Sequence, residues 1–198
     1  MSSQFQSQSL HHARITAPMT LSNDQLRQLL RVAKDDPRLS DLYDVASIIS
    51  YTGIRLREFS TLRWADVDFA NSRAEIFSGK AMSQRCIPIG PDTLKILEAR
   101  RCRKPVSVFV LGESPMSLLL RVARQLREVG NRIGVGLVSA SVLRHTFFMR
   151  LLTAGMVVPA VMAIGGFKHP SLVMKFIPNQ LHQCREAVPF LTQIENGL

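Results

Sequence analysis

The residues best suited to chemistry in this sequence begin with an arginine and a glutamate three positions apart. Both lie in TGIRLREFSTLRWADVDF, residues 52–69, where Arg55 follows a glycine turn at the start of a predicted helix. Backbone N–H groups and the helix dipole favour an anion at such a place. Glu58 is spaced to orient the guanidinium group of Arg55. The segment therefore predicts an anion-binding arginine, although an arginine that only caps the turn would have the same pattern.

A second candidate arginine lies in SVLRHTFFMRLLTAG, residues 141–155, on a predicted helix with an apolar face. Buried arginine is rare unless it is paired or binds a ligand. We therefore expect Arg144 either to have a partner within the protein or to bind a ligand. His145 is either an acid or base, or a hydrogen-bonded core histidine. Lys80, in the turn SGKAMSQR, lies at the tip of a predicted hairpin. Its ammonium could reach a phosphate or a leaving oxygen, or could simply be solvated.

Hydrophobic periodicity places these residues on a mainly helical chain. Helices are predicted from about residue 22, from about 42 to 52, and over 56–63, 91–101, 117–129, 141–154 and 158–164, with a broken helical stretch over 170–194. Short β-like runs at 67–69, 74–77 and 86–89, separated by turn signals, predict a small antiparallel sheet, and 108–111 can be extended. The expected fold class is mainly α with one small antiparallel sheet (α+β).

Composition and charge indicate the kind of partner. The chain has 198 residues, 46% of them apolar, which is enough for one domain with a core. Its net charge of +10 favours a polyanionic partner, nucleic acid first, over a surface that is merely basic. Cys86, Cys102 and Cys184 fit neither a disulfide framework nor a zinc pattern. We expect a cytoplasmic protein with no cofactor, no metal site and no membrane association.

Together, the two arginine segments and the hairpin between them resemble the tyrosine recombinases, the phage integrase family, over about residues 20–178. The resemblance implies the catalytic-domain fold of that family and site-specific recombination or integration of duplex DNA. In the family, two arginines clamp the scissile phosphate and a hairpin lysine protonates the leaving 5′-oxygen. Two histidines, or a histidine and a tryptophan, assist, and a C-terminal tyrosine attacks the phosphorus.

Matched position by position, Arg55 and Arg144 correspond to the two clamping arginines. Glu58 corresponds to the acidic residue of the first segment, Lys80 to the hairpin lysine, and His145 to the histidine that often follows the second arginine. Fixed guanidinium groups can stabilise the negative charge on non-bridging phosphate oxygens bidentately. The phosphate-clamping part of the family's site is therefore present in the sequence.

The departures from the family fall on the other side of the chemistry. Ser141 stands where the family usually has a histidine, three residues before Arg144. In GGFKHPSLVMKF, Phe176 stands at the tyrosine position and Phe167 at the position of a second histidine, while His169 is two residues away and is a candidate DNA contact after a local backbone shift. Phenylalanine lacks the oxygen needed to attack phosphorus.

Two histories explain Phe176. A substitution made to trap a DNA complex would change that position alone, whereas natural loss of cleavage also accounts for Ser141 and Phe167. Natural loss is therefore the favoured interpretation. The tyrosines of the chain, Tyr43 and Tyr51, belong to the second predicted helix, far in sequence from the family's nucleophile position.

The expected organisation is a flexible arm over 1–19, a catalytic-type domain over 20–178 and a C-terminal tail over 179–198. Active family members carry a further N-terminal domain, so the chain is expected to be either an excised catalytic domain or a short protein. The tail could cover its own domain, or mediate self-association or contact with a partner recombinase.

Three functions remain open at this point. The first is a cleavage-deficient domain that binds duplex DNA through its phosphates. The second is an active strand transferase using Tyr51, a partner's tyrosine or an activated water. The third is an interaction or regulatory module with a relic site.

Overall fold

The computed structural model describes residues 19–78, 83–103, 105–112 and 114–176. The described helices are α1 (Asn23–Asp35), α2 (Ser40–Thr52), α3 (Leu56–Thr61), α4 (Pro91–Arg103), α5 (Pro115–Arg132), α6 (Ala140–Thr153), α7 (Val158–Gly165) and α8 (Ser171–Met174). Two 3-10 turns, Pro37–Leu39 and Trp64–Asp66, precede α2 and the sheet, respectively. The sheet consists of β1 (Val67–Asp68), β2 (Arg73–Ser78) and β3 (Ser83–Pro88).

Local signals in the sequence set the ends of the first two helices. The hydroxyl of Ser22 accepts from the backbone of Gln25, and the Gln25 side chain accepts from the backbone of Ser22, which is the predicted capping box of α1. At the end of α2, Gly53 has φ +64 and donates its N–H to the carbonyl of Ile49. A Cβ atom at Gly53 would lie 2.4 Å from Phe147, so both the backbone and the packing require glycine here.

The sheet is an antiparallel meander in the order β1-β2-β3. Ala74 pairs with Val67 on one side and with Ile87 on the other. Ala74, Ile76 and Ile87 are buried, so one face of the sheet packs on the core. The tip of the β2–β3 hairpin, including Lys80, lies outside the described residues.

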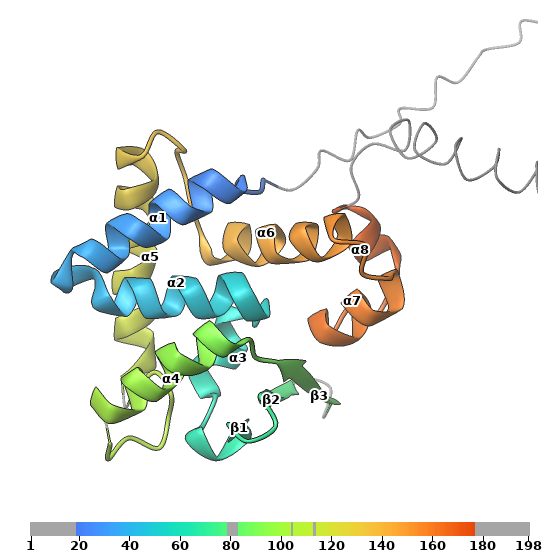
Figure 1. Cartoon of the computed structure of the whole chain (residues 1–198), viewed down its shortest axis with the longest axis horizontal. Helices are drawn as coiled ribbons and strands as arrows, with labels where there is room; N and C mark the ends of the chain where they lie inside the picture. Colours follow the sequence, from blue (N-terminus) through green and yellow to red (C-terminus); the bar gives the residue numbers. More distant parts are fainter. Residues whose placement is uncertain (1–18, 79–82, 104, 113, 177–198) are drawn as a thin grey trace, which may run out of the picture.

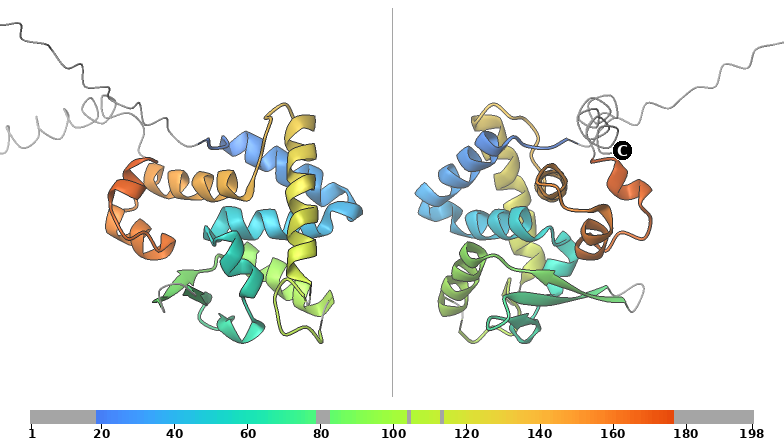
Figure 2. Two further views of the ribbon diagram at one scale, coloured as in Figure 1. Left: turned by 180° about the vertical axis from the view of Figure 1, so that it is seen from behind. Right: turned by 45° about the vertical axis from the view of Figure 1, so that its right-hand side comes forward.

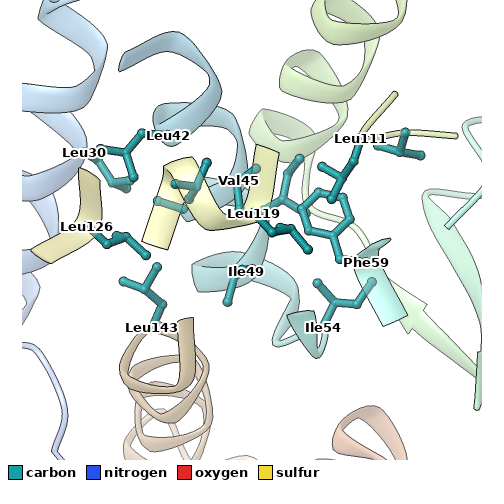
Figure 3. Packing of buried hydrophobic residues seen from close by; sticks show 14 of the residues in the cluster. Leu30, Leu42, Val45, Ile49, Ile54, Phe59, Leu111, Leu119, Leu126 and Leu143 are labelled. Atoms are coloured by element: carbon teal, nitrogen blue, oxygen red, sulfur yellow. The ribbon is translucent and has the colours of Figure 1, made fainter. Parts of the chain in front are cut away.

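Helix α2 lies at the centre of the main core and contacts α1, α4, α5 and α6. It runs between α1 and α4 in Figure 1. The left view of Figure 2, which is seen from behind, shows α5 crossing steeply in front of α1 and α2. Figure 3 shows Leu119 and Leu126 of α5 packed near Val45 and Ile49 of α2, all of them buried. Burial of these side chains is the main force that holds the helices together.

A second, smaller apolar cluster joins the C-terminal half of α6 to α7 and α8. Its buried residues are Phe147, Phe148, Val161, Val173 and Phe176. Figure 1 shows α7 and α8 beyond the end of α6, away from α1 and α4. Helix α6 therefore connects the two clusters, and Arg144 lies at the junction.

The structure confirms the predicted fold class, a mainly helical chain with one small antiparallel sheet. The third helix was predicted too long, because it ends at Thr61 rather than at residue 63. Leu62 is extended and accepts from the N–H of Val110, while the N–H of Trp64 donates to Val108. This pairing draws the chain out of the helix. The segment expected to be extended over 108–111 forms only a single bridge, between Phe109 and Arg63, and turns at 110–111. The predicted arm (1–19) and tail (179–198) lie almost wholly outside the described residues.

Candidate functional site

The first residues of the site are Arg55 and Glu58 at the N-terminal end of α3. One carboxylate oxygen of Glu58 accepts from the backbone N–H of Arg55 at 2.9 Å, and the other accepts from Nη1 of Arg55 at 2.8 Å. The three-residue spacing of a helical turn brings both groups together. The side chain of Arg55 stays 40% exposed while that of Glu58 is buried, so the arginine is oriented and still accessible.

A third arginine, Arg85 on β3, completes this cluster and was not predicted from the sequence. Its Nη1 and Nη2 donate to the two oxygens of Glu58 at 2.7 and 2.6 Å, a bidentate pair. Burial raises the pKa of Glu58, but the hydrogen bonds from Arg85 and Arg55 outweigh burial and hold the pKa at about 2. A signal did exist, since Arg85 is in phase with the buried Ile87 and Ile89 along the strand.

Arg144 enters the site from α6. It is only 9% exposed; its Nη1 donates to the carbonyl of Gly53 and its Nη2 to that of Gly165, the latter at 2.7 Å. The guanidinium carbon lies 4.6 Å from the ring centroid of Phe148 and 5.3 Å from that of Phe167. Burial, and then repulsion from Arg55, lower the pKa of Arg144 to about 9, so an anion that reached it would relieve unfavourable electrostatics.

The three arginines meet at the C-terminal end of α7. Arg85 donates its Nε to the carbonyl of Ile164 at 2.9 Å, and Arg144 donates to the next carbonyl, that of Gly165. Arg55 donates its Nη2 to the carbonyl of Gly166 at 2.9 Å. The last carbonyls of a helix lack partners within it and carry partial negative charge. Helix α7 therefore aligns three positive side chains side by side.

Arg55 and Arg144 both line a pocket of about 470 Å³ between α3, α5 and α6. The other charged or titratable residues of its lining are Arg57, Arg127 and His145, and none of the lining residues is acidic. Burial, and then the charge of Arg144, lower the pKa of His145, which favours a neutral imidazole at neutral pH. The pocket is thus suited to an anion.

The positions that depart from the family pattern lie around the edge of this site. Ser141 is exposed and lines the pocket. Phe167 packs edge-on against Phe148, at 4.9 Å between centroids. Phe176 is 4% exposed, and its ring lies 5.2 Å from that of His145. Aromatic packing therefore surrounds Phe167 and Phe176, the two positions at which the family resemblance implies a histidine and a tyrosine.

The remaining candidates are not brought into the pocket. His169 is exposed between α7 and α8 and is not among the pocket's lining residues. Tyr51 lies beside Arg150, 5.6 Å from its guanidinium carbon, and lines a different pocket between α1, α2 and α4. Its position gives no support to Tyr51 as a displaced nucleophile.

Comparison with known proteins identifies the family to which this chain belongs. Residues 19–182 match the phage integrase family. This chain belongs to the phage integrase family. Tyrosine recombinase XerA of Pyrococcus furiosus is 25% identical over 187 residues, and tyrosine recombinase XerC of Roseiflexus sp. strain RS-1 is 26% identical over 186. These alignments cover 91% and 87% of this chain but 64% and 58% of the relatives.

Solved structures agree on the phage integrase fold. The crystal structure of XerA recombinase superimposes with a TM-score of 0.73 at 22% identity, over 87% of this chain and 65% of that one. XerH site-specific recombinase bound to difH substrate gives a TM-score of 0.72 at 16% identity, over 87% and 55%. The catalytic domain of bacteriophage HP1 integrase gives 0.59 at 20% identity, over 86% and 95%. In the part of this chain that the structure describes, none of the helices has the length and apolar character that a membrane span requires.

Proposed function

We propose that this chain binds duplex DNA by clamping a backbone phosphate between Arg55 and Arg144, for site-specific recombination or integration, and that it does not cleave the strand itself. The observation that supports the clamp best is the pocket itself. Arg55, at the N-terminal end of α3, and Arg144 of α6 both line it, and its lining has no acidic residue. Phosphate contacts dominate the affinity of most DNA-binding proteins.

The neighbouring side chains support the same role. Glu58 bonds to Arg55 and to Arg85 and so holds Arg55 in place. Lys80, which lies outside the described residues, would take the role of the hairpin lysine that the family resemblance implies. Solved relatives include XerH bound to difH substrate. A DNA substrate would also place this protein in the cytoplasm.

The lack of cleavage follows from Phe176. Strand cleavage in this family needs a hydroxyl that forms a phosphotyrosyl bond, and a phenyl ring cannot form one. Ser141 and Phe167 replace two further groups that would move protons. What remains can hold a phosphate electrostatically but lacks the nucleophile, so the chain would act by occupying DNA or by joining an active partner.

Binding of a labelled random-sequence duplex, followed by fluorescence anisotropy, tests the clamp. Loss of two charged phosphate contacts in Arg55→Ala plus Arg144→Ala should weaken binding by about tenfold or more. The control, Arg27→Ala plus Arg31→Ala, removes the same charge from exposed side chains of α1. Equal losses in both double variants would favour a relic site and a protein-interaction module.

A second experiment tests the lack of cleavage. We expect no covalent protein–DNA adduct when the wild-type chain is incubated with nicked duplexes, which trap such adducts in active recombinases. An adduct with the wild-type chain would refute the assignment and would point to another nucleophile of this chain, such as Tyr51. Phe176→Tyr then separates the two histories: an adduct means that cleavage was lost at this position alone, and its absence means that Ser141 and Phe167 matter too.

A further inference from the structure

The pocket beside the arginines has an apolar interior that clamping a phosphate does not use. Its interior surface comes from Val45 of α2, Ile54, Leu119 and Leu126 of α5, and Val138 just before α6. Figure 3 labels Val45 and Leu119 at the centre of the apolar cluster, with Leu126 on one side and Ile54 on the other. A site for inorganic phosphate alone would not need such a surface, because apolar side chains add nothing to the binding of a small hydrated anion.

The charged groups lie at the pocket's edge. Arg55, Arg144 and His145 line one part, Arg57 and Arg127 are exposed, and the lining has no acidic residue. An apolar cavity with a few convergent polar groups is the usual form of a small-molecule site, and 470 Å³ lies within the usual size range. The expected ligand is therefore an anion with an attached apolar ring.

We infer that this pocket binds one nucleotide unit, with the phosphate on Arg55 and Arg144 and the base against the apolar surface of α5. The inference rests on the proposed function, because the same arginines hold the phosphate. The unit is either a free mononucleotide or a nucleotide of a DNA strand whose base has left the stack. Burial of the base in the pocket would offset the cost of taking it out of the stack.

Ala123 offers a way to fill this pocket without changing its charge. It lines the pocket from α5, is partly buried, and carries no polar group. A phenyl ring at this position would occupy the space proposed for the base and would leave every arginine in place. Ala154→Phe is the matched control, since Ala154 is exposed at the end of α6 and is not among the lining residues.

The experiment compares the binding of deoxythymidine 5′-monophosphate, inorganic phosphate and thymidine to the whole chain by titration calorimetry. The nucleotide should bind about tenfold more tightly than phosphate, which is the gain expected from burying one base. Ala123→Phe should abolish that difference, whereas Ala154→Phe should retain it. Urea unfolding of both variants verifies that they fold.

A short oligothymidylate then distinguishes the two sources. If the oligonucleotide also loses affinity in Ala123→Phe, the unit belongs to a DNA strand; if only the mononucleotide does, the ligand is free. The inference is overturned if the nucleotide binds no better than phosphate, or if Ala123→Phe leaves the difference intact. Duplex binding that depends on Arg55 and Arg144 would survive that result, so the phosphate clamp and the base pocket fail separately.

Discussion

At the scale of single residues, Glu58 fixes the positions of the arginine side chains that bond to it. It is the only acidic side chain that the described structure places between Arg55 and Arg85, and it bonds to both. Because Arg55 is held through its backbone and its side chain, its guanidinium group has a fixed orientation before any ligand arrives. Such preorganisation avoids the cost of ordering the arginine at the moment of binding.

Glu58→Gln should remove part of the pH dependence of stability. The pKa of Glu58 is lowered to about 2 from its ordinary value of 4.5, so its stabilising effect is present above pH 4.5 and is lost as the pH falls toward 2. The wild-type free energy of unfolding should drop by roughly 3 kcal/mol from this group alone.

Urea unfolding at pH 7 and pH 3 measures about 2 kcal/mol of this drop, because Glu58 is still mostly ionised in the folded chain at pH 3. In Glu58→Gln the value at pH 7 should be lower and the fall toward pH 3 smaller than in the wild type. Glu98→Gln, which removes an exposed carboxylate on α4, is the control. A fall in Glu58→Gln as steep as that of the wild type would show that Glu58 is not the group responsible.

The sequence predicted those site residues whose partners are close to them along the chain, and missed the one whose partners are far away. Arg55 and Glu58 are three residues apart, so helical spacing alone placed them together. Arg85 meets Glu58 across 27 positions and the carbonyl of Ile164 across 79. No local pattern encodes such distances: the phase of Arg85 with Ile87 along the strand indicates which face the arginine is on, but not which groups it meets.

At the scale of elements, the C-terminal end of α7 organises the arginines. Gly166 has φ +60, a conformation that costs other residues about 1–2 kcal/mol. A Cβ atom there would approach Nη1 of Arg55 and the side chain of Arg85, each at 3.2 Å. Both effects follow from the way α7 ends against the site.

Gly166→Ala should therefore lower stability and also weaken DNA binding. Gly134→Ala is the matched control, because Gly134 has φ +75 but its Cβ would meet nothing within 4 Å. Both variants should lose about 1–2 kcal/mol in urea unfolding, whereas only Gly166→Ala should weaken duplex binding in the anisotropy assay. Unchanged duplex binding by Gly166→Ala would mean that α7 does not position the arginines.

The elements themselves were largely predictable, because caps and periodicity are local. The capping box at Ser22 and the glycine at the end of α2 appear in the structure as the sequence predicts. The end of α3 was not predictable, since pairing with the segment near Val108 stops the helix. Equally, no sequence pattern indicated that α7 would present three successive carbonyls to three arginines.

At the scale of the whole molecule, the site lies where the two apolar clusters meet. Leu143 of α6 belongs to the main core, while Phe147 and Phe148 belong to the smaller cluster. Arg144 lies between them in the sequence and in space, so it is rigidly supported from both sides. The net charge of +10 adds a long-range attraction for polyanions to this fixed local arrangement.

Rigid support on the opposite side of the core comes from another ion cluster. Arg100, 1% exposed, donates to Asp44 and to Asp41 of α2 and to the carbonyl of Val110. These contacts join α2 and α4 and engage no residue of the pocket that holds Arg55 and Arg144. The ion cluster around Arg100 therefore joins helices, whereas Arg55 and Arg144 line the pocket. A variant that tests the clamp must change Arg55 and Arg144 and leave Arg100 in place.

The most direct test of the clamp is the slope of log affinity against log salt concentration for duplex binding. Each phosphate contact contributes a slope of about −0.9, so Arg55→Ala plus Arg144→Ala should reduce the steepness by roughly 1.8 if both arginines bind phosphate. Arg27→Ala plus Arg31→Ala should leave the slope close to that of the wild type. If the two double variants give the same slope as the wild type, Arg55 and Arg144 do not contact DNA phosphates and the proposed clamp is wrong.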